Sequence, residues 1–478
     1  MRIFTQIILA LNTLWFTISP TVNSYTEGVI GQPRSFLPSQ AETKNDVTIS
    51  RLIFRGLFKY DIYGSLVPEL AETWQISDDG LVYTIKLKDN QFWSDGRKIN
   101  SDDLIYTSFK VKNLVGVATD KVDDLTVRYT LPNKYSPFLS LLTIGVMPVD
   151  SEEKIDPLKP LSSGPFRIIR LDKNGPIIKQ VILIHEDPKI NIRKMIFRYY
   201  ANNDELVTAA KLGEISGFLS DKEVVLDNFE KYKFPLQGVY YALFFNLRNE
   251  KMQDLELRKY IQKALPIEQI ISDKGITVQG PISRSSFTDR SLDFNKVANK
   301  DFVIDQTKYA DTTINITIPN IKTHIKLAEA IENILENELK VEVKIIEIDP
   351  EKMLDDVIKS SNFEILLYGQ EVGRDPDRYS NWHSTQKVYP GLNLSGFEHV
   401  RADKALEEGR NVPENDSRMI HYNEFQKTFL EQIPAIFLYH PFTNYYISKY
   451  VTGVGDKYTF TISDRFLDYY NWKKIETN

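Results

Sequence analysis

The amino-acid sequence predicts an α/β protein of several domains. Residues 311–368 alternate short apolar strands with helical segments in the order βαβαβ, and residues 50–160 are dominated by the alternating patterns of strands. The length of 478 residues suggests about three domains at roughly 150 residues each. Hydrophobic residues make up 42% of the chain and charged residues 26%, which is ordinary for globular proteins and excludes a disordered or collagen-like chain.

Net charge and cysteine content exclude several classes of function. The 65 acidic and 59 basic residues give a net charge of −6, whereas nucleic-acid binding requires a clustered basic surface. We therefore expect no nucleic-acid partner. The chain has no cysteine, which excludes thiol catalysis, disulfides and the lipid-bearing cysteine of a lipoprotein. Aromatic residues make up 12% of the chain and serve either core packing or the lining of a ligand cleft.

The first 24 residues have the pattern of an export signal. Arg2 precedes an uncharged stretch over Ile3–Ile18, and Pro20 and Val22-Asn23-Ser24 follow it. A basic start, a short apolar core and a small-residue exit are typical of a secretory signal peptide, here cleaved near Ser24. An uncleaved N-terminal anchor is the alternative, although the apolar run is shorter than the roughly 20 residues of a membrane span. With either a signal peptide or an anchor, we expect the rest of the protein to be exported, to the periplasm or to the outer face of the cytoplasmic membrane.

The region 46–160 is predicted to be mostly β. Tyr83–Lys88 and Leu125–Tyr129 alternate apolar and polar residues as half-buried strands do, and the turn Asp78-Asp79-Gly80 precedes the first of them. Ser101 is placed to cap a helix that runs from about Asp102 to Lys110.

The middle of the chain continues with strands and two helices. A glycine at the end of the first helix and a proline after the second are ordinary stop signals. The predicted strands are 167–170, 177–184 and 239–247, and the predicted helices are 204–212, ending at Gly213, and 257–264, limited by Pro266.

Residues 311–368 carry the clearest architecture. Strands at 315–318, 341–348 and 363–368 are separated by an amphipathic helix at 323–339 and a second helix at 351–359. Such a βαβαβ order predicts a parallel sheet with right-handed crossovers. Ligands of parallel sheets bind beyond the carboxyl ends of the strands. The long loop after the third strand, residues 369–384, is therefore the first candidate site.

The common catalytic motifs are absent from the sequence. There is no HExxH, GxSxG, GxxxxGK[ST] or GxGxxG pattern, and the six histidines are dispersed. The paired aspartates at 78–79, 102–103 and 123–124 stand at turns and caps, where solvated acids are common. We expect no catalytic residues, no cofactor and no metal, and therefore a protein that is not an enzyme.

A long, ordered set of motifs resembles the family 5 extracellular solute-binding proteins, which are the oligopeptide- and dipeptide-binding receptors of ABC importers. The similarity covers nearly everything from residue 26 to residue 478. Its motifs are 66–74, 76–87, 92–96, 101–104, 163–166, 211–215, 241–246, 375–386, 394–397 and 433–436.

The resemblance implies the two-lobe fold of large periplasmic binding proteins (type II, three-domain form), with a hinge and a ligand cleft between lobes. Lobe 1 would combine a split domain with a mostly β insertion domain at 46–160, and lobe 2 would be the α/β region 241–440. The split domain would comprise 25–45, 161–240 and 441–478. Hinge strands are expected near Gly164–Phe166, Tyr241–Asn246 and Pro441–Tyr446. Six residues of the first motifs would build the insertion domain rather than face the ligand, namely Trp74, Asp79, Gly80, Asp95, Gly96 and Asp103.

The same resemblance implies a set of ligand-binding residues. They lie in the segment after the third strand and, more loosely, in a lobe 1 strand that pairs with bound peptides. These residues are Tyr368, Gly369, Gln370, Glu371, Arg374, Asp375, Trp382, His383, Glu42 and Thr43.

One position departs from the peptide-binding pattern. Peptide-binding members carry an aspartate three residues before the Asp/Glu-Pro step, where it pairs with the peptide α-ammonium. In this chain Asp375-Pro376 places Val372 there, and a buried ammonium without a carboxylate partner is costly. Either the adjacent Glu371 replaces it, or the ligand is not a free-amino peptide.

Three further residues of this loop have alternative roles. Arg374 either holds a carboxylate or phosphate or pairs with Asp375 or Asp377. Trp382 either packs on the ligand or wedges the loop, and His383 is expected to be a hydrogen-bonding loop residue rather than a metal ligand.

The predicted function is that of an exported receptor that binds an extended, peptide-like solute and delivers it to ABC permease and ATPase subunits. The expected partners are thus a small peptide or other small solute and the importer in the membrane, and a monomer is expected. The alternative is a surface-anchored sensory or interaction protein that keeps the fold with a degenerate cleft.

Overall fold

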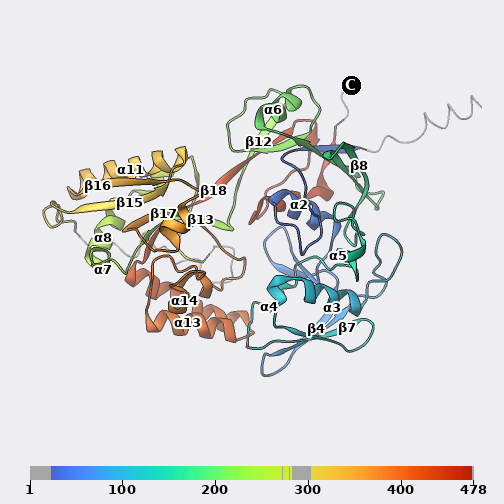
Figure 1. Cartoon of the computed structure of the whole chain (residues 1–478), viewed down its shortest axis with the longest axis horizontal. Helices are drawn as coiled ribbons and strands as arrows, with labels where there is room; N and C mark the ends of the chain where they lie inside the picture. Colours follow the sequence, from blue (N-terminus) through green and yellow to red (C-terminus); the bar gives the residue numbers. More distant parts are fainter. Residues whose placement is uncertain (1–22, 272, 279, 283–302, 476–478) are drawn as a thin grey trace, which may run out of the picture.

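The computed structural model describes residues 23–271, 273–278, 280–282 and 303–475. They form two lobes that lie side by side (Figure 1). Lobe 1 holds residues 23–235 and 442–475, and lobe 2 holds the described part of 239–441, as the strand pairing divides them. The predicted export signal lies outside the described residues except for Asn23 and Ser24, the second of which begins strand β1.

The main sheet of lobe 1 is built around β1 (Ser24–Ile30). This strand runs parallel to β10 on one side and to β11 on the other, and β9 and β8 continue the sheet in antiparallel fashion. The strands are β8 (Phe166–Asn174), β9 (Ile177–His185), β10 (Lys194–Tyr200), β11 (Gly217–Ser220) and β12 (Phe229–Pro235). Its helices are α2 (Lys44–Ile53) and α6 (Asn203–Lys211). Helix α6 ends as predicted, because Gly213 adopts a φ of +72°.

The region 46–160, expected to be mostly β, holds nearly as many residues in helices as in strands. A hairpin of β2 (Phe58–Tyr60) and β3 (Leu66–Pro68) precedes a four-stranded sheet of order β4-β5-β7-β6. Its strands are β4 (Ala71–Ile76), β5 (Val82–Leu87), β6 (Ala118–Lys121) and β7 (Thr126–Thr130), and its helices are α3 (Ser101–Lys110), α4 (Phe138–Leu141) and α5 (Ser151–Lys154).

The predicted cap of α3 is wrong by one residue. Asn100, not Ser101, is the N-cap: its side chain accepts a hydrogen bond from Asp102 N at 3.0 Å. The carboxylate of Asp103 closes the capping box by accepting from Asn100 N at 3.1 Å. The Ser101 hydroxyl instead donates to the backbone carbonyl of Asp123, which ties the helix start to the loop before β7.

Lobe 2 contains the predicted parallel unit. Strand β15 (Thr313–Pro319) pairs in parallel with β16 (Glu342–Ile348) and with β17 (Ile365–Glu371). Helix α11 (Lys322–Leu339) connects the first two strands, as expected. The second connection differs from the prediction, because it forms one π-helical turn, Met353–Ile358, instead of a full helix.

The apolar residues of lobe 2 form two cores on opposite faces of its sheet. In β13 (Val239–Phe245), Leu243 and Phe245 join the core under α11, whereas Ala242 and Phe244 join the core under α13 and α14. The remaining elements are α7 (Glu250–Gln253), α8 (Leu255–Ala264), α9 (Ile267–Ile270), β14 (Gly275–Thr277), α12 (Tyr379–Trp382), α13 (Val400–Asn411) and α14 (Asn415–Gln432).

Strand β18 (Ala435–Ser448) belongs to both lobes. Its first half pairs with β13 and β14 of lobe 2, and its second half, from Phe442 onward, pairs with β12 and β11 of lobe 1. The chain crosses a second time between β12 and β13, where Leu236 N donates to Pro441 O at 2.8 Å. The two crossings are therefore adjacent and form the hinge region.

The predicted hinge near Gly164–Phe166 is wrong. Gly164 N donates to Ile53 O at 2.8 Å, and a Cβ at Gly164 would lie 2.6 Å from Leu52 O. Both partners belong to lobe 1, so this step joins two parts of one lobe. Tyr241–Asn246 lies just beyond the hinge, inside the lobe 2 sheet.

The C-terminal segment closes lobe 1 through a buried ion pair. Arg465 donates to Glu27 Oε1 from Nε at 3.0 Å and from Nη2 at 2.9 Å, and the two side chains are 2% and 1% exposed. The hydroxyls of Tyr25 and Tyr445 satisfy Glu27 Oε2 at 2.6 and 2.9 Å. This cluster joins β1, β18 and the short helix Ile462–Phe466 beside the hinge.

Candidate functional site

The loop after β17 begins at the hinge. Strand β17 ends at Glu371, and Val372 N then donates to Gly238 O in the β12–β13 crossing at 2.9 Å. The loop therefore leaves lobe 2 at the base of the space between the lobes. This is the position that the carboxyl end of a parallel strand gives to a ligand-binding loop.

The acidic residues of this loop are held by arginines of lobe 2. Arg418 Nη1 and Nη2 bind the two carboxylate oxygens of Asp375 at 2.9 and 2.5 Å. Arg410 Nη2 binds Asp377 at 2.8 Å. The bidentate pair raises the pKa of Arg418 further above its usual range, so the guanidinium stays charged. The expectation that Arg374 pairs with Asp375 or Asp377 is therefore wrong.

Arg374 instead reaches across to lobe 1. Its Nη2 donates to Asp464 Oδ2 at 2.5 Å, and the Arg374 and Asp464 side chains are 8% and 2% exposed. The guanidinium lies over the rings of Tyr60 at 4.5 Å and Phe460 at 4.9 Å. The other oxygen of Asp464 accepts from Arg51 Nη1 at 3.2 Å, so two arginines from opposite lobes share one carboxylate.

A second bridge joins the lobes away from the hinge. Ser136 of lobe 1 donates to Arg410 O at the end of α13, from its backbone N at 2.8 Å and from its hydroxyl at 3.1 Å. The Arg410 guanidinium also lies 5.1 Å from the ring of Tyr135.

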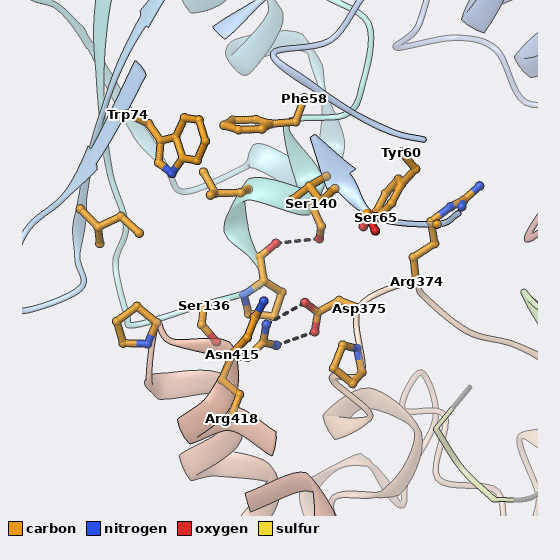
Figure 2. Close-up of a pocket in the computed structure, with 17 residues that line it drawn as sticks. Phe58, Tyr60, Ser65, Trp74, Ser136, Ser140, Arg374, Asp375, Asn415 and Arg418 are labelled. Atoms are coloured by element: carbon orange, nitrogen blue, oxygen red, sulfur yellow. Dashed lines mark hydrogen bonds and ion pairs between the residues drawn. The ribbon is translucent and has the colours of Figure 1, made fainter. Parts of the chain in front are cut away.

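A cavity of about 590 Å³ lies between the lobes. Figure 2 shows Trp74 and Phe58 along one wall and the Asp375–Arg418 ion pair across from them. Trp74 is 39% exposed, and its ring meets Phe58 edge-on at 5.0 Å. Lobe 1 contributes Phe58, Tyr60, Gly64, Ser65, Leu66, Trp74, Ile76, Ser136, Pro137, Leu139 and Ser140, and lobe 2 contributes Arg374, Asp375, Pro376, Pro413, Asn415 and Arg418.

A smaller cavity of about 230 Å³ adjoins the first. Tyr60 and Arg374 line both, so they form the wall between the two. Burial raises the pKa of Tyr60 to about 12, which keeps its hydroxyl protonated. The charged residues of the smaller cavity are Arg51, Lys59, Glu69, Arg374 and Asp464.

Two predicted ligand residues lie in the core of lobe 2. Trp382 is fully buried and packs against Phe244, Phe429 and Phe437, so it wedges the loop and does not face a cavity. Gln370 is also buried: it accepts a hydrogen bond from Tyr240 Oη and donates to Leu392 O. Both side chains are therefore buried among core residues and are not available to a solute.

Three other predicted residues around this loop also have structural contacts. His383 is 3% exposed and hydrogen-bonds Glu407 at 3.1 Å and Thr385 at 2.8 Å, which is the loop role expected for it. Gly369 lies against the Tyr241 ring, where a Cβ would come within 2.9 Å. Tyr368 is partly buried and packs on the core under α13 and α14.

Glu371, Glu42 and Thr43 border neither of the two cavities described above. Glu371 is exposed at the end of β17 opposite Val239. Thr43 caps α2 by accepting from Asp46 N at 3.1 Å, and the exposed Glu42 precedes it. The lobe 1 segment expected to be a peptide-pairing strand is thus a helix start.

The family model described as "Bacterial extracellular solute-binding proteins, family 5 Middle" matches residues 65–389. The chain belongs to this family. A curated relative, the oligopeptide-binding protein AppA of Bacillus subtilis, is 23% identical, with 87% of this chain and 85% of the relative covered. The dipeptide-binding protein of Escherichia coli is 21% identical over 93% of this chain and 95% of its own length.

Solved structures show the same fold. The unliganded open form of the periplasmic murein tripeptide-binding protein MppA matches with a TM-score of 0.78 at 15% identity, covering 96% of this chain and 98% of that one. AppA of Bacillus subtilis in complex with a nonapeptide matches with a TM-score of 0.65 at 18% identity, covering 95% and 99%. No helix among the described residues of this family 5 protein is long and apolar enough to cross a membrane.

Several residues that line the larger cavity of this family 5 chain were not expected there from the sequence. Trp74 was expected to build the insertion domain, yet it lines the larger cavity. The available signal was the spacing of Trp74 and Ile76, which puts both on one face of β4, and both line the cavity. Asp103 behaves as expected: it accepts from Trp93 Nε1 and Val149 N, both at 3.0 Å. Arg418 and Asn415 lacked any sequence signal, since they are distant in the chain.

Proposed function

We propose that this protein is the extracellular receptor of an ABC importer and binds a peptide-like solute between its lobes. One observation carries the proposal: a cavity of about 590 Å³ takes its walls from both lobes. Ligand sites of roughly 300–1,000 Å³ are typical for small molecules, and the volume suits a short peptide. The relatives named as oligopeptide- and dipeptide-binding proteins support the same class of solute.

The binding mechanism is a hinge motion without a covalent step. Both chain crossings lie together at the Leu236–Pro441 contact, so the lobes can rotate about one narrow region. A solute that touches both walls has more contacts when the lobes are joined, and it therefore shifts the population toward that arrangement. The Arg374–Asp464 and Ser136–Arg410 bridges stabilise the same arrangement.

Delivery to a permease implies export and a matching importer. We propose that the first 24 residues direct export, that the receptor acts as a monomer outside the cytoplasmic membrane, and that its partners are the permease and ATPase subunits. The alternative of an interaction protein with a degenerate cleft is not favoured, because a cavity with walls from both lobes has been retained.

Calorimetry combined with small-angle X-ray scattering tests the proposal. The purified protein is titrated with defined di-, tri- and tetrapeptide pools, each with free and with acetylated N-termini, and scattering is recorded with and without the pool that binds. We expect saturable binding and a smaller radius of gyration in the bound state. Trp74→Ala should weaken binding, whereas Tyr63→Ala should not, because Tyr63 is 77% exposed and lines neither cavity. Absence of binding by every pool would count against peptide transport.

A further inference from the structure

The charged side chains that line the two cavities do not balance. Among the described residues of these walls, four are basic and three are acidic: Arg51, Lys59, Arg374 and Arg418 against Glu69, Asp375 and Asp464. The walls therefore carry one more positive charge than negative charge.

Each of the three carboxylates already has a basic partner. Arg418 occupies both oxygens of Asp375. Glu69 lies 3.4 Å from Lys59 Nζ and accepts from Gly56 N at 3.2 Å. An ammonium group entering either cavity would thus find no carboxylate among the wall residues without a cation already beside it.

The excess charge lies where two arginines share Asp464. Besides Arg51 and Arg374, this carboxylate accepts from the backbone N of Phe460 at 2.9 Å and of Thr461 at 2.7 Å. Arg374 Nη1 is buried and has no hydrogen-bond partner, although its side chain is 8% exposed. The Arg51 side chain is 49% exposed and lines the smaller cavity. One carboxylate therefore serves two guanidinium groups, and a donor remains unsatisfied.

We propose that the inter-lobe site selects a solute that carries a carboxylate or similar anionic group and no free ammonium, with the anionic group held between Arg51 and Arg374. An anion at this point balances the charge of the walls and supplies the acceptor that Arg374 Nη1 lacks. The apolar part of the solute would lie in the larger cavity against Trp74 and Phe58. This inference rests on the proposed receptor function and narrows its solute class.

The local sequence around the hinge agrees with this selection. Val372, the first residue after β17, is apolar and packs on the core under α13 and α14. Glu371 is exposed and borders neither cavity.

A series of three tripeptides that differ only in terminal charge tests the inference. Calorimetry compares Ala-Phe-Ala, its N-acetyl form and its C-terminal amide, which carry no net charge, one negative charge and one positive charge. We expect the N-acetyl peptide to bind at least tenfold more tightly than the amide and more tightly than the free peptide. Tighter binding of the free peptide or of the amide would overturn the inference and leave the receptor function intact.

A substitution at Arg51 locates the anionic group. Arg51→Gln leaves Arg374 paired with Asp464 and removes the excess charge, so the preference for the N-acetyl peptide over the amide should fall to less than threefold. The control is Arg167→Gln, since Arg167 is similarly exposed, at 44%, and pairs with Glu186 on the outer strand β8. An unchanged preference in Arg51→Gln would refute the assigned position.

Solute capture separates failure of the inference from failure of the proposed function. The purified protein is incubated with a bacterial metabolite extract, and retained solutes are identified by mass spectrometry. Retained acids without an amine support the inference, and retained amines contradict it while supporting the receptor function. If the protein retains no solute and binds none of the three peptides, the receptor function fails and the inference fails with it.

Discussion

The bridge between Arg374 and Asp464 should hold the lobes together in the absence of solute. Arg374→Ala removes a hydrogen bond between charged groups that are 8% and 2% exposed, together with contacts to the rings of Tyr60 and Phe460. A hydrogen bond to a charged group contributes about 1.5–3 kcal/mol. Asp464 keeps Arg51 as a partner, so the penalty of an unpaired carboxylate is small. We therefore expect a loss of about 2 kcal/mol, which is a factor of roughly 30 in the ratio of joined to separated lobes.

Spin labels can measure this ratio directly, because the chain has no native cysteine. Val115→Cys in lobe 1 and Val400→Cys in lobe 2 place labels at side chains that are 78% and 84% exposed. Pulsed dipolar spectroscopy then gives the distribution of distances between the lobes. The parent should populate a shorter and a longer distance, and Arg374→Ala should shift the distribution toward the longer one. Arg167→Ala is the matched control.

An identical distance distribution in the parent and in Arg374→Ala would falsify this reasoning. It would mean that the hinge strands alone set the lobe arrangement and that Arg374 contributes only to the solute site. A lower melting temperature without a change in distance would lead to the same conclusion.

Three further predictions concern stability and affinity. Glu27→Gln should lower the free energy of unfolding by about 3–5 kcal/mol in urea titrations, because it leaves the buried Arg465 without its counter-charge; Glu186→Gln, at an exposed pair, should cost less than about 1 kcal/mol, and equal costs would contradict the assignment. Trp74→Ala should weaken binding of any cavity-filling solute by about 1–3 kcal/mol, as lost apolar contact implies, and calorimetry showing unchanged affinity would place the solute elsewhere. Burial lowers the pKa of His324 below its usual 6.5. The folded state therefore keeps its full stability above pH 6.5 and loses part of it as the pH falls toward the folded-state pKa. Urea midpoints at pH 7.5 and 5.0 should accordingly differ less in His324→Gln than in the parent.

Strand β17 shows why the sequence alone does not predict which way a site residue's side chain points. The strand was expected to end at Tyr368 but continues to Glu371, so the first residues of the predicted site segment lie within β17. A shift of one residue exchanges the faces of a strand. In the folded chain Gln370 points into the core and hydrogen-bonds Tyr240, whereas Glu371 ends exposed. Local sequence contains neither fact, since both depend on what covers each face of the sheet.

Local patterns in the sequence predicted the parallel unit with its amphipathic helix and the strands near 83–88 and 125–129, and the ordered motifs predicted the family. Hydrophobic periodicity and turn residues depend on a few neighbouring positions, so helices, strands and turns can be predicted from a single sequence. Contacts between distant residues follow only from the tertiary structure: Arg374 meets Asp464 of the other lobe across 90 residues, and Asp375 meets Arg418 within lobe 2 across 43 residues. The tertiary structure also decided that Trp74 faces a cavity and that Trp382 lies in a core. The charge of the site depends on which partners meet across the hinge, and only the folded chain brings them together.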